Sequence, residues 1–179
     1  MNNLAIREDL AIKEEVYFKL SRYLCSKNDC LDKILDLEEY YITSHSVKIA
    51  GVGDGMPHAH GDIHDISDIV IKDNEKRRVI CDMMVEMHRV MIETVEYIDS
   101  AGLTDDERQA MYMRYINVVG VEIVPGRVTE YKLRPWGQIA QETGKSFASV
   151  THAHKRAIEK LTKFEENSRD DCKKEKYVI

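Results

Sequence analysis

The stretch from Pro135 to Lys163 constrains the fold more than any other, because it predicts two short helices joined by a tight turn. Gly144 stands where the first helix should end, and glycine tolerates the left-handed backbone conformation that closes many helices. Ser146 follows with a side-chain oxygen suited to cap the next helix. One face of the first helix carries Trp136, Ile139 and Ala140, and one stripe of the second carries Val150, Ala153, Ala157, Ile158 and Leu161. These features predict a helix-turn-helix, in which the second helix is the element that enters a DNA major groove.

The same residues resemble region 4, the last DNA-binding module of bacterial sigma factors. The matching strings are IAQETGKSFASV, which begins at Ile139, and KRAIEKL, which ends at Leu161. The segment from Leu103 to Asn117 is similar to the helix that precedes this module in sigma factors. Over residues 4–163 the chain resembles small phage regulators of the ArpU/RinA-like type. The resemblance implies a phage or prophage DNA-binding transcriptional regulator, with double-stranded DNA as its partner and RNA polymerase as a further one.

Nine residues at the turn and on the second helix are the predicted DNA-binding residues. They are Lys145, Ser149, Lys155 and Arg156 for phosphates, Phe147, Ala148, Thr151 and His152 for base edges, and Ser146 at the cap. Sigma modules carry arginines early in this helix, whereas the matching positions here hold no side chain suited to a bidentate contact with guanine. The predicted readout is therefore apolar contact with thymine methyls, together with a hydrogen bond from His152.

The distribution of charge supports this interpretation although the chain as a whole is acidic. Residues 126–163 contain eight Lys and Arg against three Glu, a net charge of +5, whereas the whole chain carries −6. A basic module on an acidic body is the electrostatic pattern of a DNA-binding protein. No apolar run is long enough to span a membrane, and the four scattered cysteines lack metal-type spacing. These observations predict a cytoplasmic protein with reduced thiols.

The N-terminal part, residues 1–101, is predicted to be a long antiparallel helical hairpin for oligomerisation or partner contact. The first helix should cover residues 4–43, with a kink or short turn at Ser26–Asp29, and the second should run from about Ile63 to Ser100. A loop over residues 44–61 joins them. The predicted seam of the first helix is Leu10, Tyr17, Leu20, Leu24, Leu31, Ile34 and Tyr41. The predicted seam of the second helix is Ile66, Val70, Ile80, Met84, Met87, Met91 and Ile98. Two helices leave apolar surface half covered, which favours a homodimer or packing on the C-terminal module.

Residues 102–163 are predicted to form the DNA-binding module, opened by a capping box of Thr104 and Glu107. Its first helix should bury Ala110, Met111, Tyr115 and Ile116 and leave Arg114 outside. An inserted β-hairpin is expected at residues 118–133 about Pro125-Gly126.

Alternation of apolar residues favours a three-residue loop in this hairpin, with Val124 opposite Val128. The hairpin then acts either as a wing that brings Arg127 or Lys132 to a phosphate, or as a cover for the core of the module. Residues 164–179 are predicted to be a charged tail, as a frayed helix end or a disordered segment.

The histidines His58, His60 and His64, with nearby aspartates, are the one metal-like constellation of the sequence. Their glycine-rich surroundings also suit a plain connector, and we predict no metal and no cofactor. No P-loop, Rossmann fingerprint or nucleophile elbow is present, so no enzyme activity is predicted. Two alternatives to a regulator stay open: a small terminase-like subunit for phage DNA packaging, and a protein-binding adaptor that has kept the fold.

Overall fold

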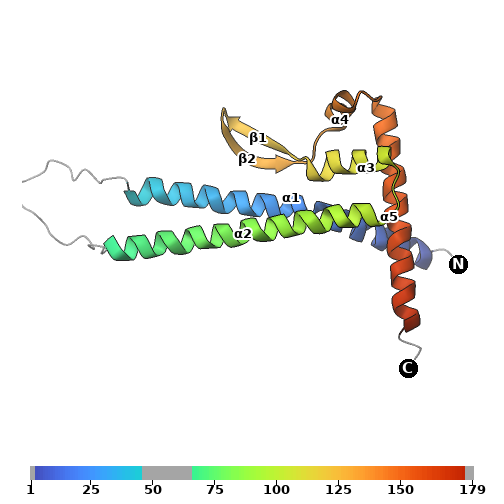
Figure 1. The fold of residues 1–179 in the computed structure, drawn as a ribbon, viewed down its shortest axis with the longest axis horizontal. Helices are drawn as coiled ribbons and strands as arrows, with labels where there is room; N and C mark the ends of the chain where they lie inside the picture. The colour runs from blue at the N-terminus through green and yellow to red at the C-terminus, as the bar shows by residue number, and fades with distance from the viewer. Residues whose placement is uncertain (1–2, 46–65, 176–179) are drawn as a thin grey trace, which may run out of the picture.

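The computed structural model describes residues 3–45 and 66–175 and is mainly helical (Figure 1). The long helices α1 (Asn3–His45) and α2 (Ile66–Ser100) form an antiparallel hairpin. The short helix α3 (Asp105–Met111) follows, with a π-helical turn η1 (Tyr112–Ile116), the strands β1 (Val119–Val124) and β2 (Arg127–Lys132), and the helices α4 (Trp136–Thr143) and α5 (Phe147–Glu175). The predicted fold class, a long helical hairpin followed by short helices with an inserted β-hairpin, is confirmed. Residues 46–61 of the predicted loop and the first residues of the predicted second helix lie outside the described residues.

Helix α1 continues without interruption through Ser26–Asp29, so of the predicted kink or short turn the short turn is absent, and the kink stays a prediction. Its buried face also differs from the predicted seam: Leu10 is 53% and Tyr17 is 45% exposed. Leu20 of the predicted seam is buried, but the other buried residues, Ile12, Val16, Tyr23 and Cys30, do not belong to that seam. The reason is that α1 packs against α5 and β2 as well as against α2, so a two-helix seam does not define its buried face.

Helix α2 buries Val90, Thr94 and Ile98 near its C-terminal end, where the rest of the molecule packs on it. Farther out, seam positions such as Val70 and Met84 are about half exposed. Other large apolar side chains of the hairpin are exposed as well, among them Phe18, Ile71, Val79, Val85 and Ile92. The hairpin is thus a half-covered element, as expected, and the homodimer stays a prediction.

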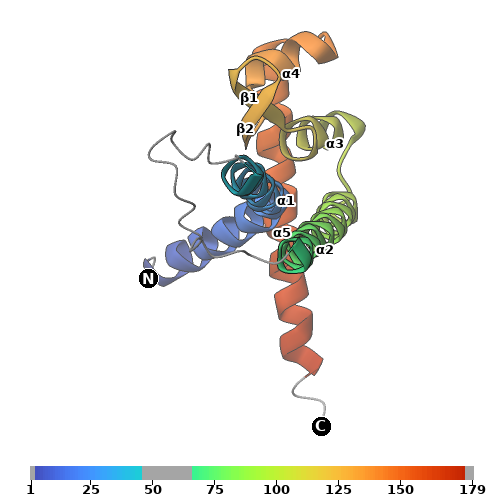
Figure 2. The same ribbon diagram turned by 90° about the vertical axis from the view of Figure 1, so that its left-hand side faces the viewer.

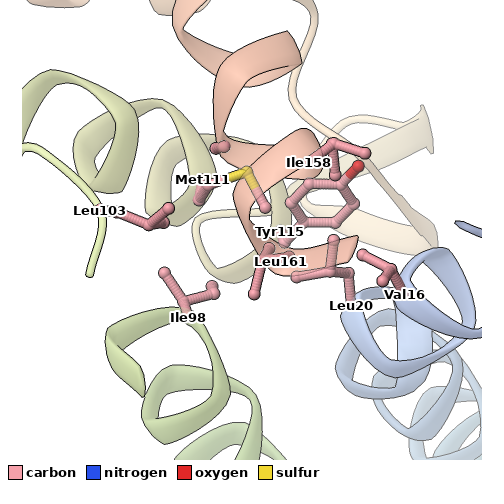
Figure 3. Packing of buried hydrophobic residues seen from close by; sticks show 9 residues of the cluster. Val16, Leu20, Ile98, Leu103, Met111, Tyr115, Ile158 and Leu161 are labelled. Carbon is pink, nitrogen blue, oxygen red and sulfur yellow. The ribbon is translucent and has the colours of Figure 1, made fainter. Parts of the chain in front are cut away.

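Helix α5 crosses the end of the hairpin and joins it to the remaining helices (Figure 2). The main core lies at this crossing (Figure 3). Its buried members are Val16 and Leu20 of α1, Ile98 of α2, Leu103, Met111 and Tyr115 of the α3 region, and Ala157, Ile158 and Leu161 of α5. One cluster therefore contains residues from both sides of the predicted domain boundary at residue 102.

The segment after Lys163, predicted to be a frayed or disordered charged tail, continues α5 as far as Glu175. Phe164 packs edge-on against Tyr97 of α2, with ring centroids 6.5 Å apart. Glu165 is only 6% exposed and accepts a 2.7 Å hydrogen bond from Lys19 of α1. The prediction was wrong for this part because charged residues here find partners on the hairpin; residues 176–179 lie outside the described residues.

The β-hairpin has a two-residue turn, so the predicted three-residue loop is wrong. Val124 pairs with Arg127, and two register shifts follow within the ladder. Gly126 has φ +81°, which suits the third position of a type II turn after Pro125. Such a turn does not match the twist of paired strands, and local irregularities absorb the mismatch. Regular alternation, on which the prediction relied, therefore fails, and Val128 lies opposite Glu122 instead of Val124.

Candidate nucleic-acid interface

The turn between α4 and α5 has the geometry that the sequence predicts. Gly144 adopts φ +66° and ψ +19°, and the backbone N–H of Lys145 donates to the carbonyl of Ala140 at 3.0 Å. This left-handed closure ends α4. The Ser146 hydroxyl then accepts a 3.1 Å hydrogen bond from the backbone N–H of Ser149, which makes Ser146 the N-cap of α5. The bend required of a helix-turn-helix is therefore present.

Small buried residues hold α4 and α5 together. A second cluster contains Ala110 of α3, Ile139 and Ala140 of α4, and Val150 and Ala153 of α5, with Met113 and Trp136 packed against it. The predicted stripe of α5 is confirmed, since all five of its members are at most 5% exposed. This stripe faces α3, α4 and helix α1 of the helical hairpin. The opposite side of the first turns of α5 is therefore left to solvent.

That opposite side holds most of the predicted base-contacting residues. Phe147 is 57% exposed, and Ala148, Ser149 and His152 are also exposed. Thr151 is half-buried, and its hydroxyl donates within the helix to the carbonyls of Phe147 and Ala148, each at 3.0 Å. The surface is thus accessible, but its side chains are small or apolar rather than cationic.

The predicted phosphate contacts divide into paired and unpaired residues. Lys145 donates to Asp106 at 2.7 Å and to Gln109 at 2.8 Å, both on α3. Arg156 donates through Nε to Glu107 at 3.2 Å. Lys155 is exposed and makes no ion pair within the described part of the chain. Two of the three predicted cations therefore already hold a carboxylate of α3.

Glu107 is the residue of this region whose role sequence reasoning missed. The predicted capping box is present, with the Glu107 carboxylate accepting from the backbone N–H of Thr104 at 2.9 Å. The same carboxylate also pairs with Lys160 at 2.7 Å. Burial opposes its ionisation, but the hydrogen bonds from Lys160, Thr104 and Arg156 outweigh burial and lower the pKa of Glu107 to about 2. The capping pattern could locate Glu107 but not its partners 49 and 53 positions later.

Beneath the exposed face of α5, His154 lies between two aromatic rings. Its ring centroid is 4.7 Å from that of Trp136, and its Nε2 atom is 3.1 Å from the hydroxyl of Tyr115. Burial lowers the pKa of His154 to about 4, so the ring is neutral at neutral pH. Arg114, predicted to lie outside the buried face, is half-buried and stacks on Trp136 at 4.5 Å. The prediction failed because Trp136 supplies an aromatic face for its guanidinium.

The β-hairpin packs against α1 rather than standing free beside α5 (Figure 1). Arg127 at its turn pairs with Glu38 of α1 at 3.1 Å, and Lys132 pairs with Glu130 at 3.0 Å. Both cations considered for a DNA-contacting wing are therefore in ion pairs within the chain.

His58, His60 and His64 lie outside the described residues. Within residues 3–45 and 66–175, no cluster of three or more His, Cys, Asp or Glu is arranged to hold a metal ion. Over the same ranges, none of the helices combines the length and apolar character needed to cross a bilayer. Comparison with protein-family models, with curated proteins and with solved structures finds no match to this chain in any of the three.

Proposed function

We propose that this protein is a sequence-specific DNA-binding transcriptional regulator, of phage or prophage origin as its resemblance to sigma region 4 and to ArpU/RinA-like regulators implies. The observation that supports the proposal best is the exposed outer face of the first turns of α5, directly after the left-handed turn at Gly144. The net charge of +5 over residues 126–163 favours a polyanionic partner.

In this proposal the first turns of α5 enter the major groove. Phe147, Ala148 and the methyl group of Thr151 contact thymine methyls, and His152 hydrogen-bonds a base edge. Lys155 and Arg156 neutralise phosphates, while the hydroxyl of Ser149 contacts a phosphate oxygen. Lys145 contributes when it exchanges Asp106 for a phosphate. The helical hairpin supplies the surface for a second copy or for another protein such as RNA polymerase.

The test is DNA affinity as a function of salt concentration, measured by fluorescence anisotropy on the full chain. The double variant Lys155→Ala/Arg156→Ala should weaken binding to all sequences and lower the slope of log K against log salt by about one to two. The matched control is Lys72→Ala/Arg78→Ala, which removes the same charge from exposed positions on α2 and should leave the slope unchanged. An unchanged slope in the first variant contradicts the docking of α5.

A protein-binding adaptor is the second candidate, because Phe147 stands 57% exposed among side chains that include no arginine reader. An exposed aromatic residue of this kind suits an apolar groove on another protein. Failure of the wild-type chain to shift any DNA fragment at low salt would favour the adaptor. A mass measurement that finds a large ring would favour a DNA-packaging subunit instead.

A further inference from the structure

The carboxylate of Glu107 joins the start of α3 to α5 although it is only 2% exposed. One oxygen accepts from Nε of Arg156 at 3.2 Å. The other accepts from Nζ of Lys160 at 2.7 Å and from the backbone N–H of Thr104 at 2.9 Å. A buried carboxylate with this many donors is fixed in place, because the loss of any donor would leave its charge less well compensated in the protein interior.

Arg156 is anchored to this fixed carboxylate by only one of its three nitrogen atoms. Its side chain remains 57% exposed, and within the described residues its Nη1 and Nη2 atoms have no hydrogen-bond partner. A guanidinium is a planar fork, so a bond at Nε sets the direction in which the two Nη groups point. Those groups remain available to bind a phosphate oxygen.

A comparison with Lys145 shows why it matters for phosphate binding that the anchored side chain is an arginine. Its ion pair with Asp106 uses Nζ, which is the atom that a phosphate would need. Two of the three N–H groups of Lys145 are already used by Asp106 and Gln109, whereas Arg156 can keep its bond to Glu107 and present both Nη groups to a phosphate. Anchoring also removes side-chain motion before DNA arrives, which lowers the entropic penalty of binding.

We infer that Glu107 is a positioning residue that holds Arg156 in place for a DNA phosphate; this inference rests on the proposed function. Glu107 itself is buried and touches no nucleotide. Its role is to preset the orientation of the Arg156 guanidinium, next in sequence to the unanchored Lys155.

The variant Glu107→Gln distinguishes a positioning role from an effect of net charge alone, because the two predict changes of opposite sign in DNA affinity. Removing a negative charge from a DNA-binding module strengthens binding if only net charge matters. Loss of the anchor instead weakens binding, by about two- to tenfold. Glu159→Gln is the matched control, since Glu159 is exposed on α5 three positions from Arg156, and this variant should bind at least as tightly as wild type. Glutamine also keeps the capping box, and a thermal melt confirms that each variant is folded.

The same substitution in an Arg156→Ala background completes a double-mutant cycle. There Glu107→Gln should no longer weaken binding, whereas a general distortion of the module would weaken it equally in both backgrounds. A second comparison uses two exposed positions and leaves the buried Glu107 itself in place. Arg156→Ala should weaken binding about two- to tenfold more than Lys155→Ala, although both substitutions remove one positive charge. Equal losses, or an affinity of Glu107→Gln no lower than that of Glu159→Gln, overturn the inference while the proposed function stands. A wild-type chain that binds no DNA at low salt removes the proposed function itself.

Discussion

The side-chain amide of Asn28 on α1 makes two hydrogen bonds with the backbone of Tyr131 on β2, 103 positions later in the sequence. Its Nδ2 donates to the Tyr131 carbonyl at 3.0 Å, and its Oδ1 accepts from the Tyr131 N–H at 2.7 Å. The amide thus takes the place that a third strand would occupy at the outer edge of β2. An unpaired strand edge invites pairing with other chains, and this bond pair closes part of it.

Asn28→Ala should therefore loosen the β-hairpin. Tyr131 would keep an N–H and a carbonyl without partners, and the expected loss of folding free energy is about 1–3 kcal/mol. Hydrogen exchange at the Tyr131 amide measures the local effect and should accelerate, while urea unfolding measures the global one. Asn74→Ala, at an exposed position of α2, is the control and should change neither. Exchange at Tyr131 that stays slow would show that the hairpin does not depend on Asn28.

Gly144→Ala should destabilise the module through backbone conformation alone. The φ of +66° is unfavourable for alanine, yet no atom lies within 4 Å of the added Cβ, so no clash contributes. The expected loss is about 1–2 kcal/mol. Gly137→Ala is a matched control: its Cβ also meets open space, but α4 is an ordinary helix there, so stability should rise by up to about 1 kcal/mol. Thermal unfolding of both variants checks the prediction, which fails if the two shifts have the same sign.

Stability should decrease when the pH falls from about 6.5 to about 4, because of His154. Burial lowers the pKa of His154 from 6.5 to about 4, so in this range the unfolded chain binds a proton that the folded chain does not. The stabilisation is fully present above the unfolded pKa and is lost as the pH falls toward the folded one. The expected loss is about 2 kcal/mol between pH 7.5 and pH 5.

Urea unfolding at the two pH values measures this difference. His154→Gln should reduce it, whereas His152→Gln, at an exposed position, should not. Glu107 acts in a lower range, since its folded pKa of about 2 lies below its ordinary value of 4.5 and its contribution is lost only below pH 4.5. Equal pH dependence of the His154→Gln variant and wild type would contradict the assignment to His154.

Glu165→Ala should destabilise the whole fold although it lies in a segment rich in charged residues. The substitution leaves Lys19 without its 2.7 Å partner and opens a nearly buried site between α5 and α1. The expected loss is about 1–3 kcal/mol. Glu159→Ala, at an exposed position of the same helix, should stay within about 0.5 kcal/mol of wild type. If residues after Lys163 were a frayed tail, the two variants would unfold at the same temperature.

The sequence by itself determined the local elements of this protein. Gly144 and Ser146 define the turn, because the left-handed conformation and the N-cap depend on residues within one turn of the chain. The capping box of Thr104 and Glu107 and the buried stripe of α5 follow from spacing in the same way. The order of long hairpin, β-hairpin and short helices was predictable because loop residues and apolar periodicity are local signals.

Only the tertiary structure decided which polar groups meet. Asn28 lies in the segment where a kink or short turn was expected, and its side chain pairs with a strand 103 positions away. Glu107 was expected to be a cap and also pairs with Arg156 and Lys160, and the charged segment after Lys163 packs on the hairpin through Glu165. The physical reason is that a hydrogen-bonding or charged side chain has many acceptable partners, and local spacing does not select among them. The partner is fixed only when distant segments are brought together by apolar packing.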